Sequence, residues 1–275
     1  MYILKQIPSE AKIKKQLRKA IFGKNIFCPV CRSQRVICYE SRYRCRKCRL
    51  KFSLLSHTWL SGMKLSFQNF YLILWCWQNK VPVMQTMNLM HLSEKAVRHW
   101  FDLFRSNLPD LSLILEKKVQ MDEAYSKDRS ILLAKQIGTR NLAWEILLKN
   151  SVDQHDAVNF MIQYIKPRTR FQTDGAMIYK NGKKYWMLRH KSDNHSKWEF
   201  SLTSEIEGMF GNMRTFIRRM YHHSTPEKLP EYVRNSASDF PYRKYLKHPI
   251  VTWLKRYLLY QLGRYALGTP RCQAL

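Results

Sequence analysis

The sequence is poor in acidic residues for its length. It carries 20 Asp and Glu against 48 Lys and Arg over 275 residues, which gives a formal charge of +28. Aromatic residues make up 13% of the chain, so it is a folded protein with a core and not a disordered basic tail. A folded chain with this excess of cations most often binds nucleic acid, and the charge is larger than solubility alone requires.

Long apolar runs and targeting signals are also absent. The longest apolar run, residues 70–77, is far shorter than the roughly 20 residues that span a membrane. Residues 1–16 lack the apolar core of a secretory signal peptide. No internal repeat or low-complexity segment is present. These absences argue against a membrane-spanning or secreted protein, and we expect a cytoplasmic location with no membrane partner.

Four of the seven cysteines form two C-x-x-C pairs, Cys28 with Cys31 and Cys45 with Cys48, thirteen residues apart. Each pair can turn both thiolates toward one ion, and two pairs supply the four sulfurs that structural zinc prefers. The intervening VICYESRYRC alternates as a strand does, so the pattern predicts a zinc ribbon in a reduced compartment. A redox pair is the alternative. The remaining cysteines are not expected to be ligands: Cys38, Cys76 and Cys272.

Helical patterns lie on both sides of the ribbon. Residues 9–22 predict a short basic helix with Ser9 as its cap, and residues 66–80 predict a second helix that Pro82 ends. Ser93 predicts the start of a third, whose outward residues would be Lys95, Arg98 and His99. The last two helices resemble a helix-turn-helix, which would place Arg98 on DNA. A plain helical hairpin between domains is the alternative.

The pattern changes to strands from residue 113. The segments KVQMDEAY, SILLAKQI and LAWEILLKN predict three strands, residues 153–165 predict a helix, and RFQTDGAMIYK predicts a fourth strand. This order indicates an α/β domain with a mixed sheet. We expect Asp122 to close the first strand and Asp174 to follow the fourth. Their carboxylates would then meet at one sheet edge and repel one another unless a cation lay between them.

A third acid comes from residues 203–221, a predicted amphipathic helix. Its apolar stripe contains Ile206, Phe210, Met213, Ile217 and Met220. Glu207 lies on a neighbouring face with Arg214 and Arg218. Three carboxylates would make a hard-oxygen site for Mg²⁺ or Mn²⁺, and two such ions about 4 Å apart serve phosphodiester chemistry. The alternatives are a capping box formed by Ser204 and Glu207, and ordinary turn aspartates.

These segments together resemble a known family. CPVC, CRKC, KFSLLSHTWLSGMKLSF, MDEAY, TDGAMIY, DNHS, TSEIEGMFGNMRTFIRRMYHH and PEKLPEY resemble bacterial and archaeal insertion-sequence transposases of the DDE class. Within that class they resemble the group with an N-terminal zinc ribbon and a ribonuclease-H-like catalytic domain. The resemblance implies DNA cleavage at transposon ends and strand transfer into a target, without a covalent protein–DNA intermediate. It assigns metal binding to Asp122 and Asp174, and to Glu207 at the usual distance of the third acid.

The chain departs from the family around the third acid. Thr203-Ser204 stands where the family often has Thr-Asn, and Arg214 stands where it often has Lys. Ser126-Lys127-Asp128 replaces the Gly-rich residues that often follow the first motif. Part of the group uses Asn or His as the third ligand, so Glu205 or Ser204 is an alternative to Glu207.

Accessory residues surround the predicted site. Glu123 is a rival to Asp122, but in a regular strand the Glu123 side chain would project to the opposite face. His195 is the best candidate for proton transfer among the histidines near the site. The phosphates beside the site are expected to lie along three guanidinium groups: Arg214, Arg218 and Arg219.

The sequence thus predicts a multidomain α+β chain with Zn²⁺ in a structural site and Mg²⁺ or Mn²⁺ in a catalytic one. The expected domains are a helix and zinc ribbon (1–60), a helix-turn-helix-like domain (61–112), a ribonuclease-H-like catalytic domain (113–245) and a basic helical tail (246–275). The expected partner is double-stranded DNA at transposon ends and target, bound by a homodimer or larger assembly near the prokaryotic nucleoid. The alternatives are a non-catalytic DNA-binding regulator and a metal-dependent nuclease without strand transfer.

Overall fold

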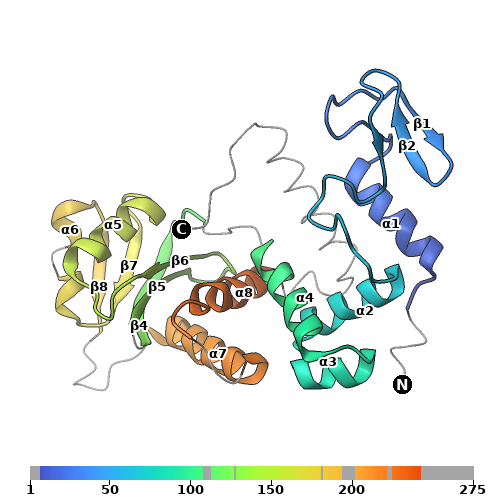
Figure 1. The fold of residues 1–275 in the computed structure, drawn as a ribbon. Helices are drawn as coiled ribbons and strands as arrows, with labels where there is room; N and C mark the ends of the chain where they lie inside the picture. Colours follow the sequence, from blue (N-terminus) through green and yellow to red (C-terminus); the bar gives the residue numbers. More distant parts are fainter. Residues whose placement is uncertain are drawn as a thin grey trace. The chain divides into compact units, whose positions relative to one another are not determined.

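The computed structural model confirms a mixed α+β protein with more than one compact part. It describes residues 7–107, 113–126, 128–180, 182–193, 202–221 and 225–242. These residues divide into two compact units, one before and one after the 109–110 peptide (Figure 1). No helix within these ranges is long and apolar enough to cross a membrane. The predicted basic tail, 246–275, lies outside the described residues.

The first unit opens with the predicted helix and ribbon. Helix α1 (Glu10–Phe22) starts at Ser9, whose hydroxyl accepts the Lys12 amide at 3.4 Å. Strands β1 (Val36–Tyr39), β2 (Arg42–Cys45) and β3 (Lys51–Phe52) form an antiparallel sheet in that order. The Phe22 ring packs at the end of α1 against three rings of this region: Phe27, Tyr43 and Phe52. The ribbon therefore has a small aromatic core of its own.

Three helices follow where two were predicted. They are α2 (Phe67–Gln78), α3 (Val83–Met90) and α4 (Glu94–Ser106). The additional helix, α3, begins directly after Pro82, which the sequence interpretation took only as a stop. Proline fixes φ near −65° and lacks an N–H, so it is as compatible with a helix start as with a helix end.

The predicted helix-turn-helix-like pair corresponds to α2 and α4, but α3 lies between them in the chain, so the helix that a short turn joins to α4 is α3. The turn passes through His91 in the left-handed region, at φ 52°, and Ser93 caps α4 by accepting the Ala96 amide at 3.3 Å. The α4 side chains Lys95, Arg98 and His99 are exposed, as predicted. The Arg98 guanidinium bonds Glu94 at 2.6 Å on the same helix.

The second unit contains a five-stranded mixed sheet. Its strands are β4 (Lys118–Ser126), β5 (Arg129–Gln136), β6 (Leu142–Leu147), β7 (Arg170–Thr173) and β8 (Arg189–Ser192), in the spatial order β6-β5-β4-β7-β8. Strands β4, β7 and β8 are parallel, whereas β5 is antiparallel to β4 and β6. The short edge strand β8 was not predicted, because RHKS has neither apolar alternation nor β-branched residues.

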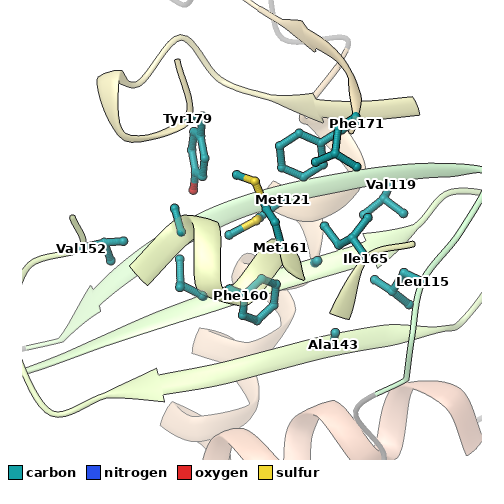
Figure 2. Close-up of a cluster of buried hydrophobic side chains, with 14 residues drawn as sticks. Leu115, Val119, Met121, Ala143, Val152, Phe160, Met161, Ile165, Phe171 and Tyr179 are labelled. Carbon is teal, nitrogen blue, oxygen red and sulfur yellow. The ribbon is translucent and has the colours of Figure 1, made fainter. Parts of the chain in front are cut away.

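Helices cover both faces of this sheet. Helix α5 (Gln154–Tyr164) packs on one face through Phe160 and Met161, against strand residues that include Val119 and Met121 (Figure 2). Helices α7 (Ser204–Tyr221) and α8 (Leu229–Tyr242) contact each other and pack on the other face. Between β7 and β8 the chain forms the short helices η2 (Met177–Tyr179) and α6 (Gly182–Tyr185). Successive β4 residues therefore alternate between an α5 face and an α7 face.

Helix α7 follows the predicted periodicity with small shifts. Four of the five predicted stripe residues are buried, Ile217 is half-buried, and the buried set also includes Met209 and Phe216. The helix boundary does not match the alternative interpretation, a capping box formed by Ser204 and Glu207. The Glu207 amide donates to the Thr203 carbonyl at 3.0 Å, so the helix boundary lies at the buried Thr203.

Candidate active site and cysteine cluster

The sheet register brings Asp122 and Asp174 together. Strands β4 and β7 pair in parallel up to Gln120 opposite Gln172, so two residues further along, Asp122 and Asp174 stand at equivalent positions. Asp174 directly follows β7, as predicted. Asp122 does not close its strand, because β4 continues to Ser126 by pairing with β5. The β4 residues beyond Gln120 have no β7 partner, and this leaves room for the Asp174 loop.

Glu207 reaches this place from α7. The side chain is exposed in the first turn of the helix, and its Oε1 accepts the Thr203 hydroxyl at 2.8 Å. Glu207, Asp174 and Asp122 interact electrostatically, since each of the first two raises the pKa of the third. The fold thus converges three carboxylates from β4, the end of β7 and α7.

Asp122 has the most perturbed carboxylate of the three. Burial, followed by the neighbouring Glu123 charge, raises the pKa of Asp122 to about 7, against a hydrogen bond from the Glu123 amide that lowers it. Asp174 and Glu207 add to the increase. A half-buried carboxylate beside others of the same sign favours the proton, or a cation in its place. The donor set consists of hard carboxylate oxygens, which suit Mg²⁺ and Mn²⁺.

The oxygens of the three carboxylates do not all lie within 4.8 Å of one another. Among the residues that the structure describes, only a cysteine group brings three or more ligand atoms all within 4.8 Å of one another. Ligands on opposite sides of a single Mg²⁺ are about 4.2 Å apart. The three acids therefore do not converge on a single point in this structure as the four cysteines do.

The two rival acids have other partners. Glu205 forms an ion pair with Lys135 of β5, a side chain that is 6% exposed. Glu123 lies on the α5 face, where it accepts the hydroxyl of the fully buried Tyr179 and that of Tyr125. Burial raises the pKa of Glu123, and the bond from Tyr179 opposes that increase. Both acids border the three carboxylates from positions that their own partners fix.

The four predicted zinc cysteines form one cluster in the ribbon. The Sγ atoms of Cys28 and Cys48 are 3.5 Å apart, as are those of Cys31 and Cys45, and all four lie within 4.8 Å of one another. Sulfurs on a tetrahedral zinc are about 3.8 Å apart, from a Zn–S bond of about 2.3 Å. The cluster therefore has the dimensions of a four-thiolate zinc site.

Both cysteine loops have the same backbone turn. Each has a left-handed arginine directly after its second cysteine, Arg32 at φ 59° and Arg49 at φ 60°. A hydrogen bond from the Cys48 amide is the largest of several that lower the pKa of Cys45 to about 7. These loops thus direct backbone N–H groups toward sulfur, which favours the thiolate that binds metal.

The other predicted site residues have separate locations. Arg214, Arg218 and Arg219 are exposed along α7. His195 lies outside the described residues. Sequence reasoning did not find Gln120, which contacts the start of α7, or the bond between Tyr179 and Glu123. The alternation of KVQMDEAY placed Gln120 on the Asp122 face, but no local pattern indicated its partner.

Comparisons with known proteins add little to this geometry. No protein-family model and no curated protein sequence matches the chain. A search of solved structures found similarity to the cryo-electron microscopy structure of a simian T-cell lymphotropic virus intasome in complex with the PP2A regulatory subunit B56 gamma. The identity is 11%, with a TM-score of 0.31, over 74% of this chain and 77% of the other.

Proposed function

We propose that this protein is a DNA transposase that cleaves DNA at transposon ends and transfers the strand into target DNA with divalent metal ions. The observation that carries this proposal is the convergence of Asp122, Asp174 and Glu207 in a chain with a formal charge of +28. A cluster of acids is unfavourable by itself, but it is expected where a protein must hold cations against a polyanion.

The fold supports a ribonuclease-H-like catalytic domain over about residues 113–245. Its mixed sheet places Asp122 and Asp174 on adjacent parallel strands, and α7 covers the same face and adds Glu207. The ribbon (1–60), the helix-turn-helix-like domain (61–112) and the basic tail (246–275) complete the proposed domain organisation.

In this proposal the three carboxylates hold ions and take no proton. Mg²⁺ or Mn²⁺ bound there would make water, and later a DNA 3′-hydroxyl, a better nucleophile toward phosphate. The hydroxyl of Thr203 orients the Glu207 carboxylate, and the Glu123 amide orients that of Asp122 at 2.9 Å. Catalysis then consists of positioning and charge neutralisation.

The exposed cations provide the proposed DNA contacts. Arg214, Arg218 and Arg219 extend along α7 away from Glu207, so a DNA backbone that entered the site would run past them. Arg98 on α4 is proposed to lie on the DNA of the transposon end. Double-stranded DNA is thus the proposed partner, bound by two or more copies of the chain in the prokaryotic cytoplasm.

The test is Mg²⁺-dependent nicking and joining of labelled duplexes that carry the inverted repeats flanking the coding region. We expect the parent protein to nick these ends and join them to a plasmid. Glu207→Gln and Asp174→Asn should lose at least about 100-fold in rate while keeping DNA affinity, because the amides lack the charge that holds the cation.

Ser204→Ala is the matched control, since Ser204 is exposed in the first turn of the same helix and is not its cap. It should retain activity and change stability by less than about 0.5 kcal/mol. Full activity in Asp174→Asn would refute the metal mechanism. Nicking without joining would indicate a nuclease, and DNA binding without either reaction would indicate a regulator.

A further inference from the structure

The first turn of α7 is held by a side chain from the sheet. Gln120 of β4 is 2% exposed, and its Oε1 accepts the backbone N–H groups of Glu205 at 3.0 Å and Ile206 at 3.1 Å. Amides at a helix start have no partner within the helix and need one from elsewhere. Here the buried Gln120 carboxamide supplies that partner, and the Ile206 amide also donates to the Thr203 carbonyl at 3.0 Å.

The adjacent strand contributes a second attachment to the same turn. Lys135 of β5 is the cross-strand partner of Gln120 and is 5% exposed. Its ammonium group pairs with the Glu205 carboxylate. The main chain and a side chain of this helical turn are therefore bound by two neighbouring residues in one row of the sheet.

This row lies next to the candidate active site. Gln120 precedes Asp122 by two residues, so both side chains project to the α7 face. Glu205 likewise precedes Glu207 by two residues at the start of α7. The strand that carries Asp122 thus also holds the helical turn that carries Glu207. A shift of this turn would change the separation between the two carboxylates.

We propose that Gln120 is a positioning residue that, with Lys135, holds α7 so that Glu207 and Asp122 are at the separation the metal ions require. This inference rests on the proposed function. Gln120 touches neither substrate nor metal, and it acts through the backbone of Glu205 and Ile206. Its effect should therefore appear first in the Mg²⁺ requirement of the reaction.

The test compares the parent with Gln120→Met, which keeps the length of the side chain and removes the acceptor. It measures the Mg²⁺ dependence of nicking and, by calorimetry without DNA, the Mg²⁺ affinity of the protein, and both should weaken in the variant. We expect the Mg²⁺ concentration for half-maximal rate to rise by about 10-fold to 100-fold. The rate at saturating Mg²⁺ should recover. A purely structural defect would instead lower the maximal rate without moving the Mg²⁺ midpoint.

Gln172→Met is the matched control. Gln172 is the β7 neighbour of Gln120 in the sheet and is also buried, but its Oε1 accepts no hydrogen bond from the described residues. It should keep the midpoint of the parent. An unchanged midpoint in Gln120→Met, or an equal rise in Gln172→Met, would overturn the inference.

A third variant keeps the test decisive if Gln120→Met does not fold. Lys135→Met removes the same ion pair from the sheet side and leaves the Glu205 carboxylate, which is 40% exposed, in place, and it should raise the midpoint in the same direction. An unchanged midpoint there would also overturn the inference. Failure of the proposed function would look different. The parent would then show no Mg²⁺-dependent nicking, or its nicking would persist in Asp174→Asn.

Discussion

At the residue scale, the main feature is a group of like charges gathered around one half-buried carboxylate, Asp122. Asp122 is close to three other acids, and two of its neighbours, Asp174 and Glu207, come from distant parts of the chain. Such repulsion destabilises the folded state when no cation is bound. The arrangement is expected where binding matters more than stability.

The repulsion predicts a pH-dependent stability. Burial and Glu123 raise the pKa of Asp122 to about 7 in the folded protein, whereas it is about 3.9 in an unfolded chain. The folded state therefore holds the proton more tightly. Its free energy of unfolding should fall by roughly 2–4 kcal/mol as the pH rises from 4 to 7, and then level off. Urea unfolding without Mg²⁺ measures this.

Two variants separate Asp122 from the other acids. Asp122→Asn should remove most of the decrease between pH 5 and 7. Asp153→Asn should keep the decrease of the parent, because a bond from Lys149 lowers the pKa of Asp153 to about 2. A decrease that persists in Asp122→Asn would assign the pH dependence to another group.

A second prediction concerns two tyrosines that share Glu123. The hydroxyl of Tyr179 donates to Glu123 from a fully buried position, whereas Tyr125 is 55% exposed and donates at 3.3 Å. Tyr179→Phe leaves the half-buried Glu123 carboxylate short of one donor and should cost about 1–3 kcal/mol. Tyr125→Phe should cost less than about 0.5 kcal/mol, because water replaces its hydroxyl. Urea unfolding of both variants provides the comparison, and equal losses would contradict it.

At the element scale, small elements of this chain depend on contacts from outside themselves. The three strands of the ribbon are two to four residues long, too few to be stable alone. The cysteine cluster and the aromatic contacts from α1 supply the missing stabilisation. Helix α2 shows the same dependence, since the Glu10 carboxylate accepts the Phe67 and Gln68 amides at its start, at 3.1 Å and 2.9 Å.

The ribbon gives the third prediction. Cys45→Ser should release one zinc per chain and increase proteolysis of residues 24–55, because metal binding and folding are coupled in such domains. Cys38→Ser is the control, as Cys38 is an exposed ribbon cysteine outside the cluster. It should keep its zinc. Metal analysis of the purified proteins decides, and full zinc content in Cys45→Ser would reject the four-thiolate site.

At the scale of the whole molecule, charge dominates. Basic side chains are exposed on α4, on α7 and throughout the ribbon, while the carboxylate cluster is confined to one place on the sheet. A net charge of +28 creates a field that attracts DNA generally. Specific recognition then requires base contacts from particular residues.

The fourth prediction follows from this charge. If phosphate contacts dominate, DNA affinity should fall by at least about 1,000-fold between 50 and 200 mM salt, as the contacts of many cations release counterions. Replacing Arg214, Arg218 and Arg219 together by Gln should lower the slope of log affinity against log salt. Fluorescence anisotropy measures both. A slope near zero in the parent would contradict broad phosphate contact.

The sequence alone determined the features that depend on local spacing. The C-x-x-C pairs fixed which thiols cluster, Ser9 and Ser93 fixed two helix starts, and the 3.6-residue period fixed the buried face of α7. It also placed Glu123 on the face opposite Asp122, because alternation is a local property of a strand. The helix α3 after Pro82 and the polar strand β8 lacked such a signal.

Only the tertiary structure decided which residues meet. The parallel register of β4 and β7 sets Asp122 against Asp174 across about 50 residues of chain, and the extension of β4 past Asp122 depends on pairing with β5. The Thr203 hydroxyl bonds Glu207, the Gln120 side chain accepts two amides at the start of α7, and Lys135 pairs with Glu205. Spacing could not show that Glu207 interacts with Asp122 while Glu205 pairs with Lys135, because only folding brings these partners near.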